Sequence, residues 1–138
     1  KVSFKDSMIN KRCVIFADGF YEWKKINGQK IAYHIKVKDR QMFAFAGLWN
    51  KYEYEGKSHY GAVIITTKAN DFMADIHDRM PVILKDEEIK SWLNPNNKNS
   101  NILLTTYPSG LMSAHEVSNQ VNHPSFKDVS CIKKIETT

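Results

Sequence analysis

Cysteine is scarce in this sequence, which contains only Cys13 and Cys131 among its 138 residues. The two cysteines form neither a CxxC motif nor the dense framework of a disulfide-rich domain, so we expect a reducing, cytoplasmic setting. Long apolar runs are also absent: no stretch reaches the roughly 18 to 20 residues of a membrane span, and no apolar region follows a basic start as in a signal peptide. The sequence therefore predicts a soluble protein with no membrane partner.

Several motifs that carry catalysis or bind cofactors are missing. There is no Gly-rich phosphate loop, no G-x-S-x-G turn, no pair of histidines at the spacing of a zinc-binding helix and no heptad stripe. We therefore expect neither a metal nor a cofactor. Since the sequence also lacks internal repeats, linkers and low-complexity tracts, residues 1–138 are expected to form one domain.

Basic residues outnumber acidic ones. The 20 Lys and Arg residues against 15 Asp and Glu residues give a formal net charge of +5. Such an excess suits a phosphate backbone, although a solvated basic surface without a nucleic-acid partner has the same composition. Charge alone leaves both interpretations open.

Strand patterns dominate the chain after residue 12. Strands are predicted at residues 13–17, 20–25, 31–37, 42–49, 62–67 and 111–117. The pair Asn27-Gly28 is a preferred centre of a tight turn, which predicts a hairpin from the second and third of these strands. Residues 42–49 and 62–67 are nearly continuous in apolar or β-branched residues, and we expect both in the core.

Short helices are predicted between the strands. Asn70 can cap a brief helix that ends before His77. Asp86 is expected as the N-cap of a helix over residues 87–93, and a further short helix is predicted at residues 102–107. Many strands with few short helices indicate an α+β domain built on a strongly curved, barrel-like, mainly antiparallel sheet.

The first segment with chemical potential is residues 16–23, where a carboxylate interrupts a cluster of aromatic residues just after a turn. An aromatic setting would favour the protonated form of Glu22 and make it a usable acid or base near neutral pH. Alternatively, Glu22 points into water at a strand edge. Trp23 can stack on a base if it is exposed, although most tryptophans lie in the core.

The second segment is residues 75–81, which carry an imidazole, carboxylates and a guanidinium at a helix end. His77 can serve as acid, base or hydrogen-bond donor, and either Asp75 or Asp78 can fix its tautomer. Arg79 can hold a phosphate. A solvated loop of mixed charge is the alternative.

Taken together, residues 12–23 (RCVIFADGFYEW) and 75–81 (DIHDRMP) resemble the two signature segments of the SRAP family, the SOS-response-associated peptidases. The similarity extends to residues 46–49, to residues 62–67 and to the Val-Asn-rich turn at residues 118–124. The resemblance implies a protein of the DNA-damage response that binds single-stranded DNA and forms a covalent bond to abasic sites, with an associated self-processing peptidase activity.

In that family, the amine and thiol of an N-terminal cysteine condense with the aldehyde of an abasic sugar. The resemblance implies that Glu22 is the main acid and base and that His77 assists at the sugar oxygen. Trp23, Thr66 and Arg79 would contact the DNA beside the lesion. The implied partner is single-stranded DNA, and we expect a monomer.

The family's opening Met-Cys-Gly-Arg and its Asn-Ala-Arg segment have no counterpart in this sequence, so we expect a domain without its N-terminal segment and without the attacking group. Two other functions stay open. One is a Cys-His hydrolase that uses Cys13 or Cys131 with His77. The other is a non-catalytic nucleic-acid module in which Glu22 and His77 are structural.

Overall fold

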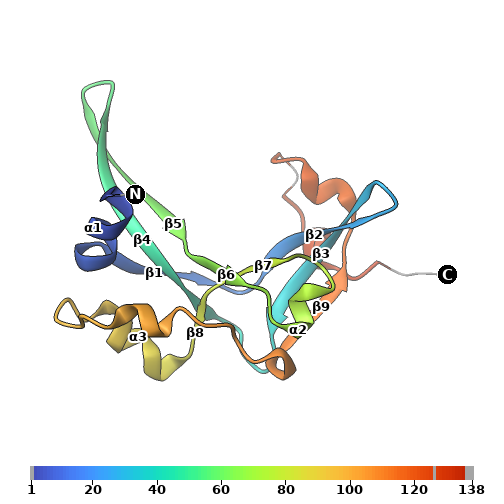
Figure 1. The fold of residues 1–138 in the computed structure, drawn as a ribbon. Helices are drawn as coiled ribbons and strands as arrows, with labels where there is room; N and C mark the ends of the chain where they lie inside the picture. The colour runs from blue at the N-terminus through green and yellow to red at the C-terminus, as the bar shows by residue number, and fades with distance from the viewer. Residues whose placement is uncertain (1, 126, 136–138) are drawn as a thin grey trace.

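Antiparallel strands form most of the computed structural model, which describes residues 2–125 and 127–135 (Figure 1). The strands are β1 Arg12–Ala17, β2 Phe20–Ile26, β3 Gln29–Val37, β4 Phe43–Tyr54, β5 Lys57–Ile64, β6 Thr66–Lys68, β7 Arg79–Pro81, β8 Ile83–Leu84 and β9 Met112–Glu116. The helices are α1 Val2–Asn10, α2 Asp71–Ala74 and α3 Asp86–Leu93, and the 3-10 turns are η1 Ser100–Leu103, η2 Ser109–Leu111, η3 Asn119–Asn122 and η4 Val129–Ile132.

The strands of the described residues belong to three sheets. One has the order β1-β4-β5, with β8 also paired to β4; the second has the order β2-β3-β9; the third pairs β6 with β7. All pairings are antiparallel. The predicted α+β class with a mainly antiparallel arrangement is confirmed, but the strands are divided among these sheets and no closed barrel is seen in the described part of the chain.

The β2–β3 hairpin forms where the turn pair predicts it. Asn27 and Gly28 both have positive φ angles, 49° and 81°, as a two-residue turn of type I′ requires. The turn fixes the register, which places Trp23 opposite Ala32. Because β2 is at the edge of its sheet, it leaves one side open to solvent and to other parts of the chain.

The core consists of two clusters. One lies around Phe43 and Phe45 of β4 and includes Met73 of α2, and the other lies around Trp92 of α3. The predicted burial of residues 42–49 is confirmed for Phe43 to Leu48, whereas within residues 62–67 it is confirmed only for Ile65 and is wrong for the exposed residues 62–64. The second segment is divided between β5 and β6, and Val63 is 61% exposed because the β4–β5 hairpin extends beyond the core as an arm (Figure 1).

The helix predictions were confirmed in part. Asn70 caps α2, accepting the backbone N–H of Met73 at 2.8 Å. The N-cap of α3 is Lys85 rather than Asp86: the backbone N–H of Lys85 donates to the Glu88 carboxylate at 2.7 Å, and Asp86 is the first helical residue, with its carboxylate paired with Arg40. The expected helix at residues 102–107 is wrong: only the 3-10 turn η1 forms, and the chain beyond it is irregular. Among the described residues, no helix is long and apolar enough to cross a membrane.

Candidate functional site

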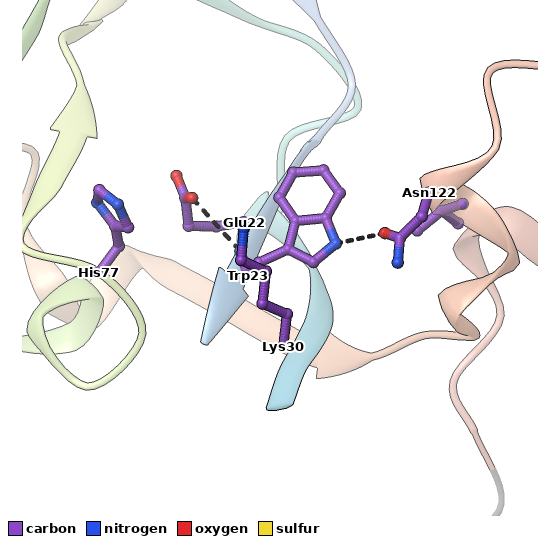
Figure 2. Close-up of a pocket in the computed structure, with 6 residues that line it drawn as sticks. Glu22, Trp23, Lys30, His77 and Asn122 are labelled. Atoms are coloured by element: carbon purple, nitrogen blue, oxygen red, sulfur yellow. Dashed lines mark hydrogen bonds between the residues drawn. The ribbon is translucent and has the colours of Figure 1, made fainter. Parts of the chain in front are cut away.

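An open pocket of 440 Å³ brings together segments that are far apart in the sequence. It is lined by side chains from β2, β3, η3 and the segment after α2: Glu22, Trp23, Lys30, His77, Val121 and Asn122. Figure 2 shows the Glu22 carboxylate between the His77 ring and the Trp23 indole. Three residues predicted as functional, Glu22, Trp23 and His77, therefore share one pocket.

Glu22 and Trp23 reach the pocket from the edge strand β2. Both side chains are half-buried, so each remains partly accessible to a ligand. The backbone N–H of Trp23 donates a long hydrogen bond of 3.3 Å to Glu22 Oε1. This bond holds the carboxylate at the strand edge, where it can still exchange protons with a bound molecule.

His77 follows α2 and is fixed at both its backbone and its ring. Its N–H donates to the carbonyl of Met73 at 2.8 Å, and its ring Nδ1 accepts the backbone N–H of Arg79 at 3.1 Å. A backbone amide always carries its hydrogen, so this bond makes Nδ1 an acceptor and leaves the proton of the neutral ring on Nε2. His77 can therefore offer an N–H donor to a ligand.

Neither aspartate fixes the His77 tautomer as the sequence suggested. Asp78 Oδ1 lies 3.2 Å from Nδ1, but an ion pair there requires a protonated imidazole. Nδ1 cannot accept a hydrogen bond from Arg79 and donate one to Asp78 at once. Because the Arg79 amide can only donate, it determines which nitrogen of the neutral His77 ring carries the proton. Asp75 is the C-cap of α2, and its backbone N–H bonds to Met73.

Arg79 and Thr66 lie together on neighbouring strands. The Arg79 guanidinium donates to the carbonyl of Thr66 at 2.9 Å and to its hydroxyl at 3.1 Å. Both residues are exposed. Because the Arg79 backbone holds the His77 ring, the structure connects Thr66, Arg79 and His77 in one series of hydrogen bonds. Thr66 and Arg79 do not line the pocket itself.

Three pocket residues, Lys30, Val121 and Asn122, were missed as site residues by the sequence analysis. Lys30 is exposed on β3 near the hairpin turn, and it brings a positive charge to the pocket. Asn122 Oδ1 accepts the indole N–H of Trp23 at 2.6 Å. The hairpin register could have placed Lys30 near Trp23, and the only sequence signal for Asn122 was the Val-Asn-rich turn at residues 118–124.

The cysteines do not line this pocket. Cys13 is on β1 opposite Gly47, and burial raises the pKa of its thiol, which disfavours the reactive thiolate. Among the residues that the structure describes, no group of three or more His, Cys, Asp or Glu side chains is arranged to hold a metal ion.

An α+β domain of antiparallel sheets with an acid, an imidazole and a tryptophan in one open pocket agrees with the family resemblance. Residues 1–124 match the SRAP family, described as SOS response associated peptidase. This chain belongs to the SRAP family.

Known relatives and structures support the assignment. The chain is 50% identical over 129 residues to the abasic site processing protein YoqW of Bacillus subtilis, a match that covers 90% of this chain and 58% of YoqW. It is 31% identical over 160 residues to the abasic site processing protein HMCES of Xenopus tropicalis, covering 100% of this chain and 48% of HMCES. A crystal structure of a protein from Bacteroides thetaiotaomicron superposes with a TM-score of 0.91 at 32% identity, covering 99% of this chain and 62% of that protein. The chain thus spans less than two thirds of the length of these relatives.

Proposed function

We propose that this chain is the strand-holding and proton-transferring part of a protein that processes abasic sites in single-stranded DNA. The observation that carries the proposal is the shared pocket of Glu22, His77 and Trp23, since they come from separate segments and their residue types match the needs of this reaction. The names of YoqW and HMCES, both abasic site processing proteins, give independent support.

Opening of an abasic sugar assigns one role to Glu22 and another to His77. An abasic sugar is mostly a closed hemiacetal, so opening it requires a proton to leave the C1 hydroxyl and another to reach the ring oxygen. Glu22 takes the proton of the C1 hydroxyl and returns a proton to the ring oxygen as the C1–O bond breaks, while the Nε2–H of His77 donates a hydrogen bond to the sugar oxygen and stabilises its developing negative charge. The same two groups then assist loss of water when an amine adds to the aldehyde.

The DNA strand is held beside the pocket. The Trp23 indole is half-buried and lines the pocket, so one ring surface is available to stack on a neighbouring base. Arg79 is exposed next to Thr66 and supplies a guanidinium for a phosphate. The charge of +5 favours the same ligand.

The attacking group is proposed to come from the family's N-terminal cysteine, which would also serve the self-processing peptidase activity. Cys13 is unsuited because its thiol is partly buried, with a raised pKa, and lies outside the pocket. This chain alone should therefore bind single-stranded DNA in a salt-sensitive way and form no covalent adduct.

The test is a chimera in which the whole N-terminal part of the family's domain, from Met-Cys-Gly-Arg through the Asn-Ala-Arg segment, precedes Lys1. Mixed with single-stranded DNA carrying one abasic site, it should give a denaturation-resistant shifted band, and Glu22→Gln should slow its formation by about 10²- to 10⁴-fold. Glu53→Gln is the matched control, because Glu53 is exposed on β4, lies outside the pocket and accepts a hydrogen bond from the Ser58 hydroxyl of the same hairpin.

Two results would count against the proposal. Unchanged adduct rates in Glu22→Gln, with unchanged DNA affinity, would favour a non-catalytic nucleic-acid module. An adduct formed by the 138-residue chain alone would mean that another group attacks. Peptide hydrolysis that is lost on alkylation of Cys13 or Cys131 would instead favour the Cys-His hydrolase hypothesis.

A further inference from the structure

The indole of Trp23 is bonded across the pocket to the 3-10 turn η3. Its Nε1–H donates to Asn122 Oδ1 at 2.6 Å, a contact between residues 99 positions apart (Figure 2). We propose that Asn122 is a positioning residue that fixes the plane of the Trp23 indole, so that the ring stacks on the nucleobase next to the lesion. The inference rests on the proposed function and adds η3 to the DNA-binding site.

Both ends of this hydrogen bond are anchored to the same residue of β3. Trp23 is directly opposite Ala32 in the β2–β3 hairpin. Val117, which is fully buried and lies two residues before η3 begins, donates its N–H to the carbonyl of Ala32 at 3.0 Å. Backbone hydrogen bonds therefore fix β2 and the η3 turn relative to each other, independently of the bond between the Trp23 and Asn122 side chains.

The turn that carries Asn122 is itself well defined. Ser118 Oγ accepts the N–H of Gln120 at 3.2 Å, and the carbonyl of Ser118 accepts the N–H of Val121 at 3.3 Å. On the far side, the N–H of His123 donates to the carbonyl of Gln120 at 3.1 Å. These bonds close the backbone around Asn122, so its amide oxygen is presented from a fixed position.

A fixed indole plane matters for stacking. A tryptophan side chain has two rotatable bonds, and a half-buried one can rotate away from a parallel base unless something restrains it. Stacking on an aromatic face tolerates any base, because every nucleobase has a π-face. The ligand class is therefore a nucleobase of any identity, which suits recognition of lesions in varied sequences.

The hydrogen bond is exposed to solvent, and this limits its effect. Water competes for both partners, and a typical net contribution of about 0.5 to 1.5 kcal/mol corresponds to roughly two- to tenfold in affinity. We expect Asn122→Ala to weaken binding of the 138-residue chain to an unmodified single-stranded oligonucleotide by about two- to tenfold. The slope of log Kd against log salt should stay the same, because no phosphate contact is lost.

A double-mutant cycle separates positioning from folding. Trp23→Phe keeps an aromatic ring but has no N–H for Asn122, so adding Asn122→Ala in that background should cause no further loss of affinity. Asn119→Ala in the same turn is the matched control and should bind as the unmodified chain does. Equal losses from Asn122→Ala in both backgrounds would overturn the proposal, because they would mean that Asn122 supports the turn and not the indole.

A measurement without DNA tests the bond directly. The Nε1–H cross-peak of Trp23, identified by its absence in Trp23→Phe, should shift and exchange faster with solvent in Asn122→Ala, and Asn122→Asp should restore it because it keeps the acceptor oxygen. An unmoved cross-peak refutes the positioning role even if DNA binds normally. If the cross-peak behaves as expected but the chain binds no DNA, the proposed function and the stacking role are refuted. The hydrogen bond between Trp23 and Asn122 is then confirmed without a role in DNA binding.

Discussion

Arg12 of β1 is predicted to contribute more to stability than any other polar side chain that connects α1 and α3 to the sheet. Its guanidinium donates to the carbonyls of Met8 in α1, Trp92 at 2.7 Å and Asn94 at 2.6 Å, and it lies 5.6 Å from the centre of the Trp92 ring. These carbonyls lie at the C-terminal ends of α1 and α3, where the helix dipole favours a cation. Arg12→Met should therefore loosen both helices from the sheet.

The size of the effect follows from the exposure of these bonds. The bonds to Met8 and Trp92 are partly buried, whereas the bond to Asn94 is exposed. Arg12→Met removes two partly buried bonds from a charged donor, at about 1.5 kcal/mol each, and this loss should lower the free energy of unfolding by about 3 kcal/mol. With a urea m-value of about 1.5 kcal/mol/M, the midpoint of unfolding should fall by about 2 M.

The matched control is Arg40→Met. Arg40 also makes a short charged contact, 2.6 Å to Asp86, but the Asp86 side chain is 71% exposed. Surface pairs of this kind contribute about 0 to 1 kcal/mol, so the midpoint should fall by less than about 0.7 M. Equal losses in Arg12→Met and Arg40→Met, measured by urea unfolding followed by circular dichroism, would refute the anchoring role of Arg12.

Three further predictions concern pH, packing and charge. Burial, and to a smaller extent the nearby His115, lowers the pKa of His34. The unfolded chain therefore binds a proton at this residue more readily than the folded chain does. The contribution of His34 to the free energy of unfolding is complete above about pH 6.5 and falls below it by at most about 1.4 kcal/mol per pH unit. Urea unfolding at pH 7.5 and 5.5 should show a smaller difference in His34→Gln, and an equal difference would contradict this assignment. Gly19→Ala should destabilise by about 1 to 3 kcal/mol because its Cβ would lie 2.5 Å from His34 Nε2, whereas Gly110→Ala meets nothing within 4 Å and should change thermal unfolding by less than about 0.5 kcal/mol. Arg79→Gln should lower the slope of log Kd against log salt for single-stranded DNA by about 1, and an unchanged slope would remove Arg79 from the phosphate contacts.

The sequence by itself determined the features that depend on a few neighbouring residues. The β2–β3 hairpin follows from the ability of Asn27 and Gly28 to adopt positive φ, and the start of α2 follows from the side chain of Asn70. Residue types in two short segments were also enough to indicate the family and to select Glu22 and His77. The roles of these two residues stay predictions until the adduct experiment is done.

Tertiary structure decided the features that depend on distant partners. The exposure of Val63 could not be read from an apolar strand pattern, because the pattern does not say whether another layer covers the strand. Asp86 is the first residue of α3 instead of its N-cap, and its carboxylate pairs with Arg40, 46 positions away in the sequence. In both cases, the outcome depended on a distant part of the chain: no layer of the described residues covers Val63, and Arg40 pairs with Asp86.

The pocket shows the same division. Sequence spacing brought His77 and Arg79 into one segment, but only the folded backbone aims the Arg79 N–H at the His77 ring and so selects its tautomer. The bond between Trp23 and Asn122 depends on β3 holding both β2 and the η3 turn in place. Periodicity and motif spacing describe residues within about one element of each other, whereas a pocket is made by the packing of elements that are remote in the chain.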